Sequence, residues 1–579
     1  MRRLAGAVVL LLLAGCGLPL SNGARPGATV ADERSRLAGI KVLPPGPQRG
    51  ASAEDLVRGF LRAQASPEDD HAVARQFLRD PKEWDAGSFV LLYRPGSQVV
   101  RSDPDRPGRV ALSLQPTARI EADGSYRLIA ADRLAPVEQF RVAARADGEL
   151  RLTQVPAGLR LQRADLSRSY LPREVFFLGR STLGEANARL VPDRVFLPVT
   201  TDPARALVQA LLRGASRPLD QTVLSAAPAD TALRDLVVTD AGEVTVDLSG
   251  PVGSLSVRDR QRLSAQLVWT LQDFSGVRLL LNGEPAHVGS AAAVQTVADW
   301  NEFDPAGVRD GAPLTYVQDR RLRSLDELLG PGDATSGVVP VDEAAMDVAQ
   351  VQLAVLTRRA DQGDEVRIGG LQGPLGKPVL HRPGLGSLSW GSGDRGLWVL
   401  EAGPSPRIWV VPGAGAPASA RPVTVSYPAP PGGGRLTRLE VSRDGARIAL
   451  VLGEGPARRL YVGQVEPTPD GLVVDEVVPV APQLLDVTDV AWESGTSLVV
   501  LARDAGESGL LIARVTVDGS SAAPLLRQGV EGVPQALAAA PGRRLVVAAA
   551  GRGQPPQLFR DDLQVFRRQS LGSAPFYPG

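Results

Sequence analysis

The residues whose side chains could carry out covalent or metal chemistry are few and widely separated. The chain of 579 residues has one cysteine, Cys16, and three histidines, His71, His287 and His381. A single thiol cannot form a disulfide within the chain, and histidines so far apart in sequence lack the spacing of a zinc site. We therefore expect no metal and no cofactor, and the sequence around Cys16 decides the role of its thiol.

Cys16 stands at the end of an export signal. Arg2 and Arg3 form a short positive segment, and an apolar run follows from Leu4 to Leu13. Ten apolar residues are too few to cross a hydrocarbon layer of about 30 Å, which requires about 20. The pattern is typical of a secretory signal peptide, and we expect residues 1–15 to be removed.

The sequence Leu13-Ala14-Gly15-Cys16 resembles the lipobox of bacterial lipoproteins. The resemblance implies that Cys16 carries an S-diacylglycerol group and, after cleavage before it, an N-acyl chain such as palmitate. Two or more chains give stable anchoring, so we expect a protein anchored by lipid at the extracytoplasmic face of the cell membrane. The alternative is an ordinary signal peptide or a short anchor helix.

Composition favours a folded, multi-domain body. The chain has 64 basic and 64 acidic residues, with 43% hydrophobic and 22% charged, which excludes a disordered acidic protein and argues against nucleic acid as a partner. Removal of residues 1–15 takes away two arginines and no acid, so the net charge becomes −2. Net charge therefore does not hold the body on anionic lipid. We expect residues 16–50, rich in proline and glycine, to form a flexible linker after the lipidated cysteine.

Residues 51–160 predict an α+β domain. A helix is expected after a capping sequence at Ser52, and a second helix is expected after a Ser66 cap, with Pro67 as its first residue. Short apolar strands are expected next, at 88–93, 110–114, 126–130 and 138–144. Two helices followed by a curved antiparallel sheet resemble the nuclear-transport-factor-2-like superfold.

Asp69, Asp70 and His71 could act as metal ligands or as an acid and base pair. They fall in the expected first turn of the second helix. Acidic side chains there normally complement the positive end of the helix dipole. We therefore interpret them as structural.

Residues 186–292 predict a second α+β domain. A strand is expected at Arg194–Pro198, then a helix capped by Asp202 and ended by Gly214, and a second helix that begins after Ser256. Asn282-Gly283 predicts a tight type I′ hairpin, with His287-Val288 on the returning strand.

Four segments of this region resemble the GerMN domain in sequence, order and spacing. They are Asp-Pro-Ala-Arg-Ala-Leu-Val at 202–208, Val-Thr-Val-Asp-Leu-Ser at 244–249, Arg-Gln-Arg-Leu-Ser-Ala-Gln-Leu-Val-Trp-Thr-Leu at 260–271 and Leu-Leu-Leu-Asn-Gly at 279–283. GerMN has no established catalytic residues to carry over. We interpret Arg260, Arg262, Gln266 and Trp269 first as packing and surface residues, and only second as a contact face.

Residues 310–579 repeat with a period of about 50 and predict an all-β propeller. Apolar strand residues recur at Leu353, Leu397, Ile448, Leu498 and Leu545. Five copies are visible, and a sixth blade could be completed if Tyr316-Val317 pairs with a strand near the C-terminus. The order of lipoprotein signal, GerMN domain and propeller resembles the LpqB lipoprotein family of actinobacteria over essentially the whole chain.

The resemblance to LpqB implies a non-catalytic accessory role beside a two-component system. The expected partner is the extracytoplasmic domain of a sensor histidine kinase similar to MtrB, with MtrA as its regulator, and the expected outcome is control of cell-wall homeostasis and division. The sequence has no nucleophile elbow, zinc-protease motif or phosphate-binding loop, so we expect no enzyme. The alternatives are an envelope lipoprotein that binds a wall fragment or small molecule, and a propeller enzyme.

Overall fold

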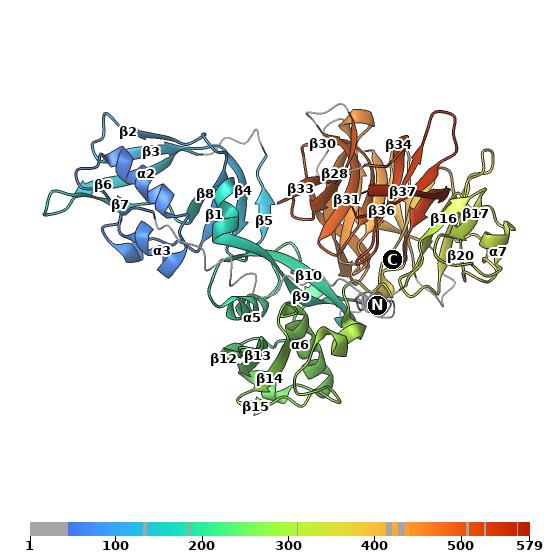
Figure 1. Cartoon of the computed structure of the whole chain (residues 1–579), viewed down its shortest axis with the longest axis horizontal. Coiled ribbons are helices and arrows are strands. Elements are labelled where there is room, and N and C mark those ends of the chain that lie inside the picture. Colours follow the sequence, from blue (N-terminus) through green and yellow to red (C-terminus); the bar gives the residue numbers. More distant parts are fainter. Residues whose placement is uncertain are drawn as a thin grey trace, which may run out of the picture. The chain divides into compact units, whose positions relative to one another are not determined.

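The computed structural model describes residues 44–130, 136–181, 186–309, 311–412, 420–426, 435–504, 509–525, 528–563 and 565–579. The expected signal peptide and Cys16 lie outside these residues. Along the described chain, an α+β domain is followed by a second α+β domain and then by an all-β domain (Figure 1). The predicted fold class is confirmed. Within the described ranges, no helix has both the length and the apolar character needed to cross a membrane.

The described part of the N-terminal domain has helices α2 and α3, the short helix α4, and two four-stranded sheets. Its first helix begins as expected, because the Ser52 hydroxyl accepts a hydrogen bond from the Asp55 N–H at 3.1 Å. The sheet orders are β5-β4-β1-β8 and β2-β3-β6-β7, with β1 and β8 parallel, so two sheets replace the single antiparallel one expected. The elements are α2 (Ala53–Ala63), α3 (Glu68–Arg75), β1 (Phe89–Tyr93), β2 (Val99–Ser102), β3 (Arg109–Ser113), β4 (Pro116–Glu121), β5 (Tyr126–Leu128), β6 (Glu138–Ala144), β7 (Leu150–Gln154), β8 (Leu159–Gln162) and α4 (Leu166–Ser169).

The second helix of this domain differs from the expectation at its start. No side chain caps α3, and the Ser66 hydroxyl donates instead to the carboxylate of Glu68. Residues 69–71 have positive φ angles of 47°, 54° and 60°, a region that non-glycine residues seldom adopt. The helix cap expected at Ser66 therefore does not form, and the expected regular first turn of this helix is wrong.

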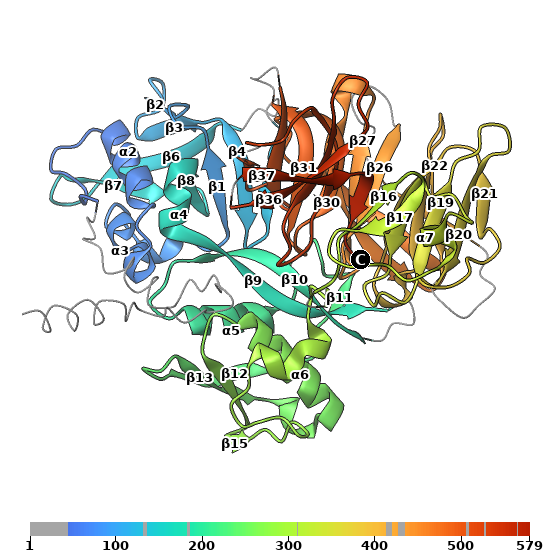
Figure 2. The ribbon, with the colours of Figure 1, turned by 45° about the vertical axis from the view of Figure 1, so that its right-hand side comes forward.

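A long β-hairpin connects the first two domains. β9 (Tyr170–Arg180) pairs antiparallel with β10 (Ala186–Pro198), and Figure 2 shows them as one extended ribbon. The strand expected at Arg194–Pro198 is the end of β10, and the short β11 (Val223–Leu224) pairs with β9. Tyr170 and Phe196 belong to the core of the N-terminal domain, whereas Val175–Leu178 belong to the core of the second.

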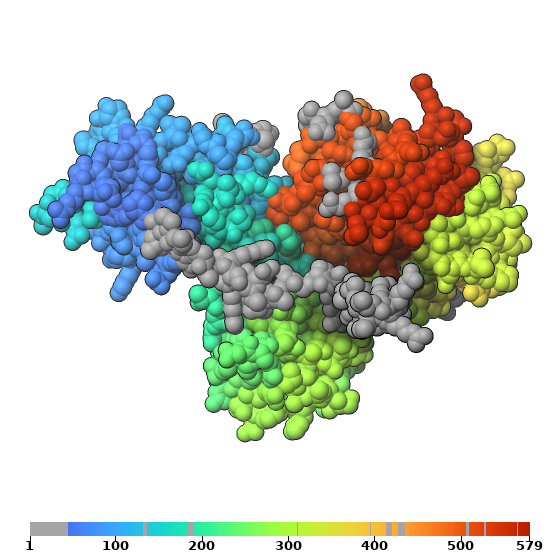
Figure 3. Space-filling model, in the orientation of Figure 1, coloured from blue at the N-terminus to red at the C-terminus, as the bar shows by residue number. Residues whose placement is uncertain are grey.

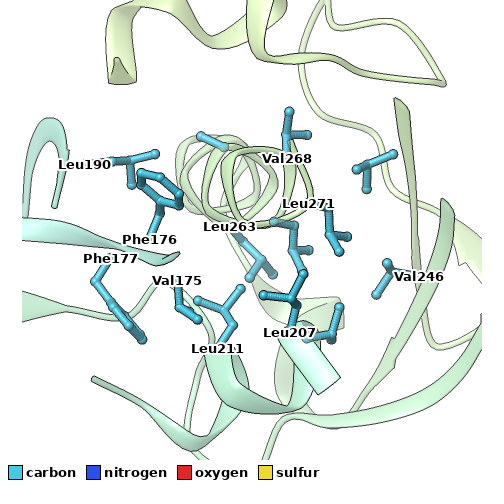
Figure 4. Packing of buried hydrophobic residues seen from close by; sticks show 14 of the residues in the cluster. Val175, Phe176, Phe177, Leu190, Leu207, Leu211, Val246, Leu263, Val268 and Leu271 are labelled. Carbon is cyan, nitrogen blue, oxygen red and sulfur yellow. The ribbon is translucent and has the colours of Figure 1, made fainter. Parts of the chain in front are cut away.

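The second domain packs two helices against a four-stranded sheet of order β12-β13-β14-β15. Both expected helix starts are confirmed, because the side chains of Asp202 and Ser256 accept hydrogen bonds from the backbone N–H groups of Arg205 and Asp259. In Figure 4, side chains from α5, α6, β9 and β13 meet in one core. The elements are α5 (Pro203–Arg213), β12 (Ala232–Val238), β13 (Glu243–Ser249), α6 (Val257–Thr270), β14 (Gly276–Leu281) and β15 (Glu284–Pro285).

The expected tight turn forms, but its returning strand is short. Asn282 and Gly283 have φ angles of 54° and 89°, as a type I′ turn requires. β15 ends at Pro285, and Gln295 instead exchanges backbone hydrogen bonds with Val277 on β14. His287 therefore lies beyond the strand and is exposed, so its expected place on the strand is wrong.

The C-terminal domain is a six-bladed propeller. In the described residues, β18–β21, β30–β33 and β34–β37 are separate four-stranded blades. Two more blades, β22–β25 and β26–β29, are joined into one eight-stranded sheet because their outer strands β25 and β29 pair in parallel. The sixth has the order β17-β16-β38, in which Thr315 pairs with Phe576 and Val317 with Ser573. The expected ring closure by the C-terminal strand is confirmed.

The repeat period coincides with the blades. Four of the five recurrent residues lie on the second strand of successive blades, and Leu545 directly precedes β35. The bounds are β16 (Thr315–Gln318), β17 (Arg321–Ser324), α7 (Asp333–Ser336), β18 (Glu343–Met346), β19 (Leu353–Thr357), β20 (Asp364–Gly369), β21 (Leu380–Arg382), β22 (Leu385–Trp390), β23 (Leu397–Glu401), β24 (Arg407–Val411), β25 (Arg421–Val425), β26 (Leu436–Val441), β27 (Arg447–Leu452), β28 (Arg459–Thr468), β29 (Gly471–Pro479), β30 (Leu484–Trp492), β31 (Ser497–Asp504), β32 (Leu510–Thr516), β33 (Ala522–Leu525), β34 (Val533–Ala538), β35 (Val546–Ala550), β36 (Gln557–Asp562), β37 (Val565–Leu571) and β38 (Ser573–Phe576).

Candidate functional site

A pocket of about 1090 Å³ is lined by residues of all three described domains. We call it the junction pocket. Its walls include apolar side chains such as Leu128, Val462 and Val478, which alternate with charged ones. Pockets of this kind, with apolar walls and a few placed polar groups, are typical of small-molecule sites. The charged lining residues are Arg94, Arg127, Arg194, Arg217, Arg447, Glu121, Asp123, Asp193, Glu476 and Asp518.

Asp193 on β10 is the buried carboxyl group of the junction pocket. Its two oxygens accept hydrogen bonds from the Ser216 backbone N–H at 2.6 Å and the Ser216 hydroxyl at 2.7 Å. Burial raises the pKa of Asp193, although these hydrogen bonds favour its charged form. A single acid within the apolar run Leu190–Leu197 was the sequence signal that could have identified it.

Asp123 reaches the same pocket from the turn between β4 and β5. It accepts hydrogen bonds from the backbone N–H groups of Arg217 at 2.9 Å and Ser125 at 2.8 Å. Burial alone would raise the pKa of Asp123, but these hydrogen bonds outweigh it and lower the pKa. Asp123 is therefore a fixed negative charge that ties the N-terminal domain to the second domain.

Two arginines tie the propeller to the hairpin beside the pocket. Arg194 forms an ion pair with Asp518 at 3.1 Å. Arg447 donates to the carbonyl oxygens of Pro192 at 2.7 Å and Gly495 at 3.1 Å. The described lining residues of the junction pocket include no histidine and no cysteine.

A second group of charges gathers on the innermost strands of the propeller. The Arg438 guanidinium lies 2.8 Å from Asp489 and 3.5 Å from Glu343, and so bridges three blades. Burial disfavours charge on Arg438, but these carboxylates raise its pKa above the ordinary value. Burial raises the pKa of Glu440 to about 7.

The acids of this group, together with two serines, also hold the blades together. In each case a side-chain oxygen on one inner strand accepts a hydrogen bond from a backbone N–H of the next blade. Unpaired edge N–H groups around the axis are thereby satisfied, so we interpret the group as structural. The acceptors are Glu343, Ser387, Ser389, Glu440 and Asp489, and the donors are Leu388, Leu439, Val441, Trp492 and Leu537.

The three histidines are not brought together. His71 is buried against Trp84 in the N-terminal domain, with ring centroids 5.9 Å apart, and burial lowers the pKa of His71. His287 is exposed in the second domain, and His381 lies on β21 of the propeller with a ring nitrogen against the Gln362 carbonyl. No group of three metal-ligating side chains occurs in the part of the chain that the structure describes.

The GerMN-like residues of α6 have structural roles. The Gln266 amide donates to the Phe176 carbonyl at 2.9 Å and accepts from the Ala226 N–H at 2.6 Å. Trp269 packs against Phe176, while Arg260 donates to the Gly253 carbonyl and Arg262 pairs with Asp259. These contacts support the interpretation as packing and surface residues, and the alternative of a contact face stays a prediction.

Three family models match the chain in succession. Residues 46–167 match the model described as "Lipoprotein LpqB, N-terminal domain", and residues 314–561 match "Lipoprotein LpqB beta-propeller domain". Between them, residues 174–287 match the Germane model, described as "Sporulation and spore germination". The matches fall on the three structural domains described above.

Three relatives that match nearly the whole chain are named Lipoprotein LpqB. Lipoprotein LpqB of Thermobifida fusca is 29% identical, covering 100% of this chain and 99% of that protein. Lipoprotein LpqB of Cutibacterium acnes is 28% identical, covering 90% and 89%, and that of Mycobacterium tuberculosis is 27% identical, covering 95% of each.

Solved structures resemble individual parts of the chain. The first GerMN domain of the sporulation protein GerM from Bacillus subtilis is 24% identical with a TM-score of 0.18, and covers 22% of this chain and 97% of that one. TolB from Acinetobacter baumannii is 12% identical with a TM-score of 0.24, covering 60% and 99%. At these scores neither carries a functional argument.

Proposed function

Because the chain belongs to the LpqB lipoprotein family, we propose that it acts as an exported, lipid-anchored accessory protein without catalytic activity. The observation that carries this proposal is the match of proteins named Lipoprotein LpqB to nearly the whole chain, with both LpqB domain models in order. The anchor is S-diacylglycerol on Cys16 with an N-acyl chain, at the extracytoplasmic face of the cell membrane.

The proposed partner is the extracytoplasmic domain of a sensor histidine kinase similar to MtrB, with MtrA as its regulator. The protein then modulates that signal, and with it cell-wall homeostasis and division. This step is supported by the family resemblance. A lipid anchor adds a physical reason, because confinement to the same membrane raises the effective concentration of the two proteins without tight intrinsic binding.

A site-specific crosslinking experiment in cells tests the partnership. A photoreactive amino acid is placed in turn at exposed Arg101 on β2, Val237 on β12 and Arg552 in the propeller. We expect the kinase ectodomain to be crosslinked from one of these domains and not from the others. Point insertion is preferable to truncation at residue 186, because that cut removes β10, which contributes to two cores.

The crosslinking result has clear alternatives. Recovery of wall polymer or transport proteins alone, from all three positions, would contradict the kinase partnership. The Cys16→Ala version of each probe is the control, since loss of the anchor should abolish the crosslink if membrane confinement is what brings the partners together.

The junction pocket favours a second function, the binding of a small envelope ligand such as a wall fragment. Leu128 is half-buried in its wall, so Leu128→Trp should fill part of the pocket. We expect Leu128→Trp to lower the affinity for a bound muropeptide at least tenfold, and Val237→Trp on exposed β12 to leave it unchanged, measured by titration calorimetry. Equal affinity in both variants would remove this pocket from consideration.

A further inference from the structure

A second pocket, of about 600 Å³, lies within the N-terminal domain. We call it the arginine pocket. It is formed by the start of the described chain at Gly46–Gln48, by the end of α3 and the residues after it, and by the neighbourhood of the β6–β7 turn. Its lining includes four arginines, Arg75, Arg79, Arg145 and Arg151, and no acidic residue. The pocket is therefore locally positive in a chain whose formal net charge is zero.

Three of the four guanidinium groups keep donors for a ligand. Arg75 is occupied, because it pairs with Asp70 at 2.6 Å and donates to backbone carbonyls. Arg79 makes one long contact of 3.5 Å to a carbonyl, and Arg151 makes one of 2.7 Å. Arg145 is exposed and has no side-chain partner among the described residues. Since a guanidinium has five N–H donors, most of theirs remain available.

Strand pairing fixes these arginines relative to one another. The Arg79 N–H donates to the Leu152 carbonyl at 2.7 Å, which places the segment after α3 beside β7. Arg145 follows directly after β6, and its backbone N–H bonds to the Glu149 carbonyl at 2.8 Å to close the turn. The β6–β7 turn, drawn in teal, stands out at the edge of the domain surface in Figure 3. The cluster is therefore built by the fold from three separate chain segments.

The neighbouring acids do not neutralise the arginine pocket by ion pairing with these three residues. Asp80 accepts from the Lys82 N–H, Asp147 from the Glu149 N–H, and Glu149 from the Gly50 N–H. One oxygen of each of these carboxylates is thus directed to a backbone group. The shape and charge of the site match an anion with several oxygens, and the planar fork of arginine is well suited to phosphate.

The position of the pocket along the chain points to a source of phosphate. Gly46–Gln48 line it, and only 30 residues separate Gly46 from Cys16. Even fully extended, a chain of that length reaches about 100 Å. The membrane that holds a lipid on Cys16 is therefore always within reach of this domain, and anionic headgroups offer phosphates at high local density.

We propose that Arg79, Arg145 and Arg151 bind the phosphate of an anionic phospholipid headgroup in the membrane to which the chain is anchored. The inference rests on the proposed lipid anchor, which supplies proximity, while the arginine pocket supplies the headgroup contact. Docking of the N-terminal domain in this way fixes which of its surfaces faces the membrane. The net charge of the body is irrelevant here, because the attraction is local and falls off within a Debye length.

Vesicle co-sedimentation of the unlipidated chain tests the contact apart from the anchor. The mature chain, residues 16–579 with Cys16→Ala and without the signal peptide, is mixed with vesicles of phosphatidylcholine alone or with 30 mol% phosphatidylglycerol added. Each arginine near an anionic surface contributes about a fivefold factor in binding. We therefore expect binding to the anionic vesicles only, lowered about a hundredfold by the combined Arg79→Gln, Arg145→Gln and Arg151→Gln substitutions.

The matched control removes the same charge elsewhere. Arg407, Arg552 and Arg568 are exposed on the propeller, and their combined change to glutamine should leave vesicle binding within twofold. Equal loss in both triple variants, or no binding by the unchanged chain, would overturn the proposal. Release of the bound protein by millimolar glycerol phosphate at constant ionic strength would support the proposal, because glycerol phosphate carries the headgroup phosphate and should compete for the same arginines.

A single substitution and a comparison with the lipidated protein complete the test. The single substitution Arg145→Glu lies on an exposed turn and should reduce binding to the anionic vesicles at least fivefold without a change in thermal unfolding. If the lipidated protein loses its membrane attachment when Cys16 is changed, while the unlipidated chain fails to bind anionic vesicles, the anchor proposal stands and the arginine pocket proposal falls.

Discussion

Glu440 on β26 shows how burial and neighbouring charge set the behaviour of one residue. Burial raises its pKa from the ordinary 4.5 to about 7, and Asp489 acts in the same direction, while Arg438 and Arg443 oppose the shift. A folded pKa above the unfolded value means that the folded state binds more protons between these two values. Stability from this residue is therefore complete below about pH 4.5 and is lost as pH rises through 7.

The substitution Glu440→Gln should remove this pH dependence. The neutral amide keeps an acceptor for the Trp492 N–H but has no proton to lose. We expect the propeller of the unchanged protein to lose stability from pH 5 to pH 8, with a slope of at most about 1.4 kcal/mol per pH unit, the limit for one proton. Calorimetric unfolding of both proteins across this range checks it.

The same comparison has a built-in control. Asp147→Asn removes an exposed acid and should leave the pH slope unchanged. An equal slope in the Glu440→Gln and unchanged proteins would show that Glu440 does not titrate in this window.

Cys16→Ala should abolish lipid attachment, because the proposed diacylglycerol is attached to this thiol. We expect the variant to accumulate as the larger precursor or to be released, with no incorporation of labelled palmitate, as seen by gel mobility and membrane fractionation. The neighbouring change Ser21→Ala leaves the lipobox-like sequence intact and should be processed normally. Incorporation of labelled palmitate into Cys16→Ala at the level of the unchanged protein would refute the assignment.

The sequence alone predicts the candidate lipid-bearing residue Cys16, but it does not predict the three arginines of the arginine pocket. Cys16 is identified by adjacent residues, since signal and thiol are contiguous. Arg79, Arg145 and Arg151 lie more than 70 residues apart at their extremes, and only pairing of the segment after α3 with β7 brings them together. A site built by tertiary pairing leaves no local pattern in a single sequence.

Among the elements, helices with strong caps were predicted well. Ser52, Asp202 and Ser256 each form the expected side-chain hydrogen bond, because capping depends on residues within one turn. The expected start of α3 is wrong. Residues 69–71 have left-handed backbone conformations, and their ordinary polar side chains do not predict such conformations. The sequence predicts only the end of β10, at Arg194–Pro198. The rest of the hairpin is missed because β9 and β10 extend far beyond that segment.

The hairpin also places one aromatic residue in a neighbouring domain. Phe196 of β10 is buried in the N-terminal core, with its ring centroid 5.4 Å from that of Tyr126. We expect Phe196→Ala to destabilise the N-terminal domain by about 3–5 kcal/mol, the usual cost of such a cavity. Increased hydrogen exchange in β4 and β5, by mass spectrometry, is the measurement.

A control on an exposed strand separates this effect from general damage to the hairpin region. Val237 on β12 is 52% exposed, so Val237→Ala should change stability by less than about 0.5 kcal/mol. If exchange rises equally in the propeller strands of Phe196→Ala, the residue does not act through the N-terminal core.

At the scale of the whole described chain, the domain order was predictable and the joints between domains were not. Repeat period and turn residues predict blades, since each blade is a local unit. The joints depend on single long-range contacts, such as Arg194 with Asp518 and Arg447 with the Pro192 carbonyl. Arginines are abundant throughout the sequence, so nothing in residue type alone distinguishes these two.

Arg447 offers the most direct test of the contact between the propeller and the β9–β10 hairpin. Its buried guanidinium bonds to carbonyl oxygens of Pro192 and Gly495 and lies 3.8 Å from the buried carboxylate of Asp444. Arg447→Ala removes the cation beside Asp444, whose Oδ1 keeps its hydrogen bonds from the Ser442 hydroxyl and the Ala446 N–H. Removal of one partner from a buried ion pair costs about 3–5 kcal/mol. We expect a lower unfolding temperature of the propeller in calorimetry and faster hydrogen exchange at residues flanking Pro192.

A second variant and a control accompany this test. Adding Asp444→Asn should recover part of the lost stability because the buried charge is removed, whereas Arg567→Ala, at an exposed position on β37, should leave stability unchanged. A shift in the propeller transition without any change on β10 would mean that Arg447 stabilises its own blade and does not couple the domains.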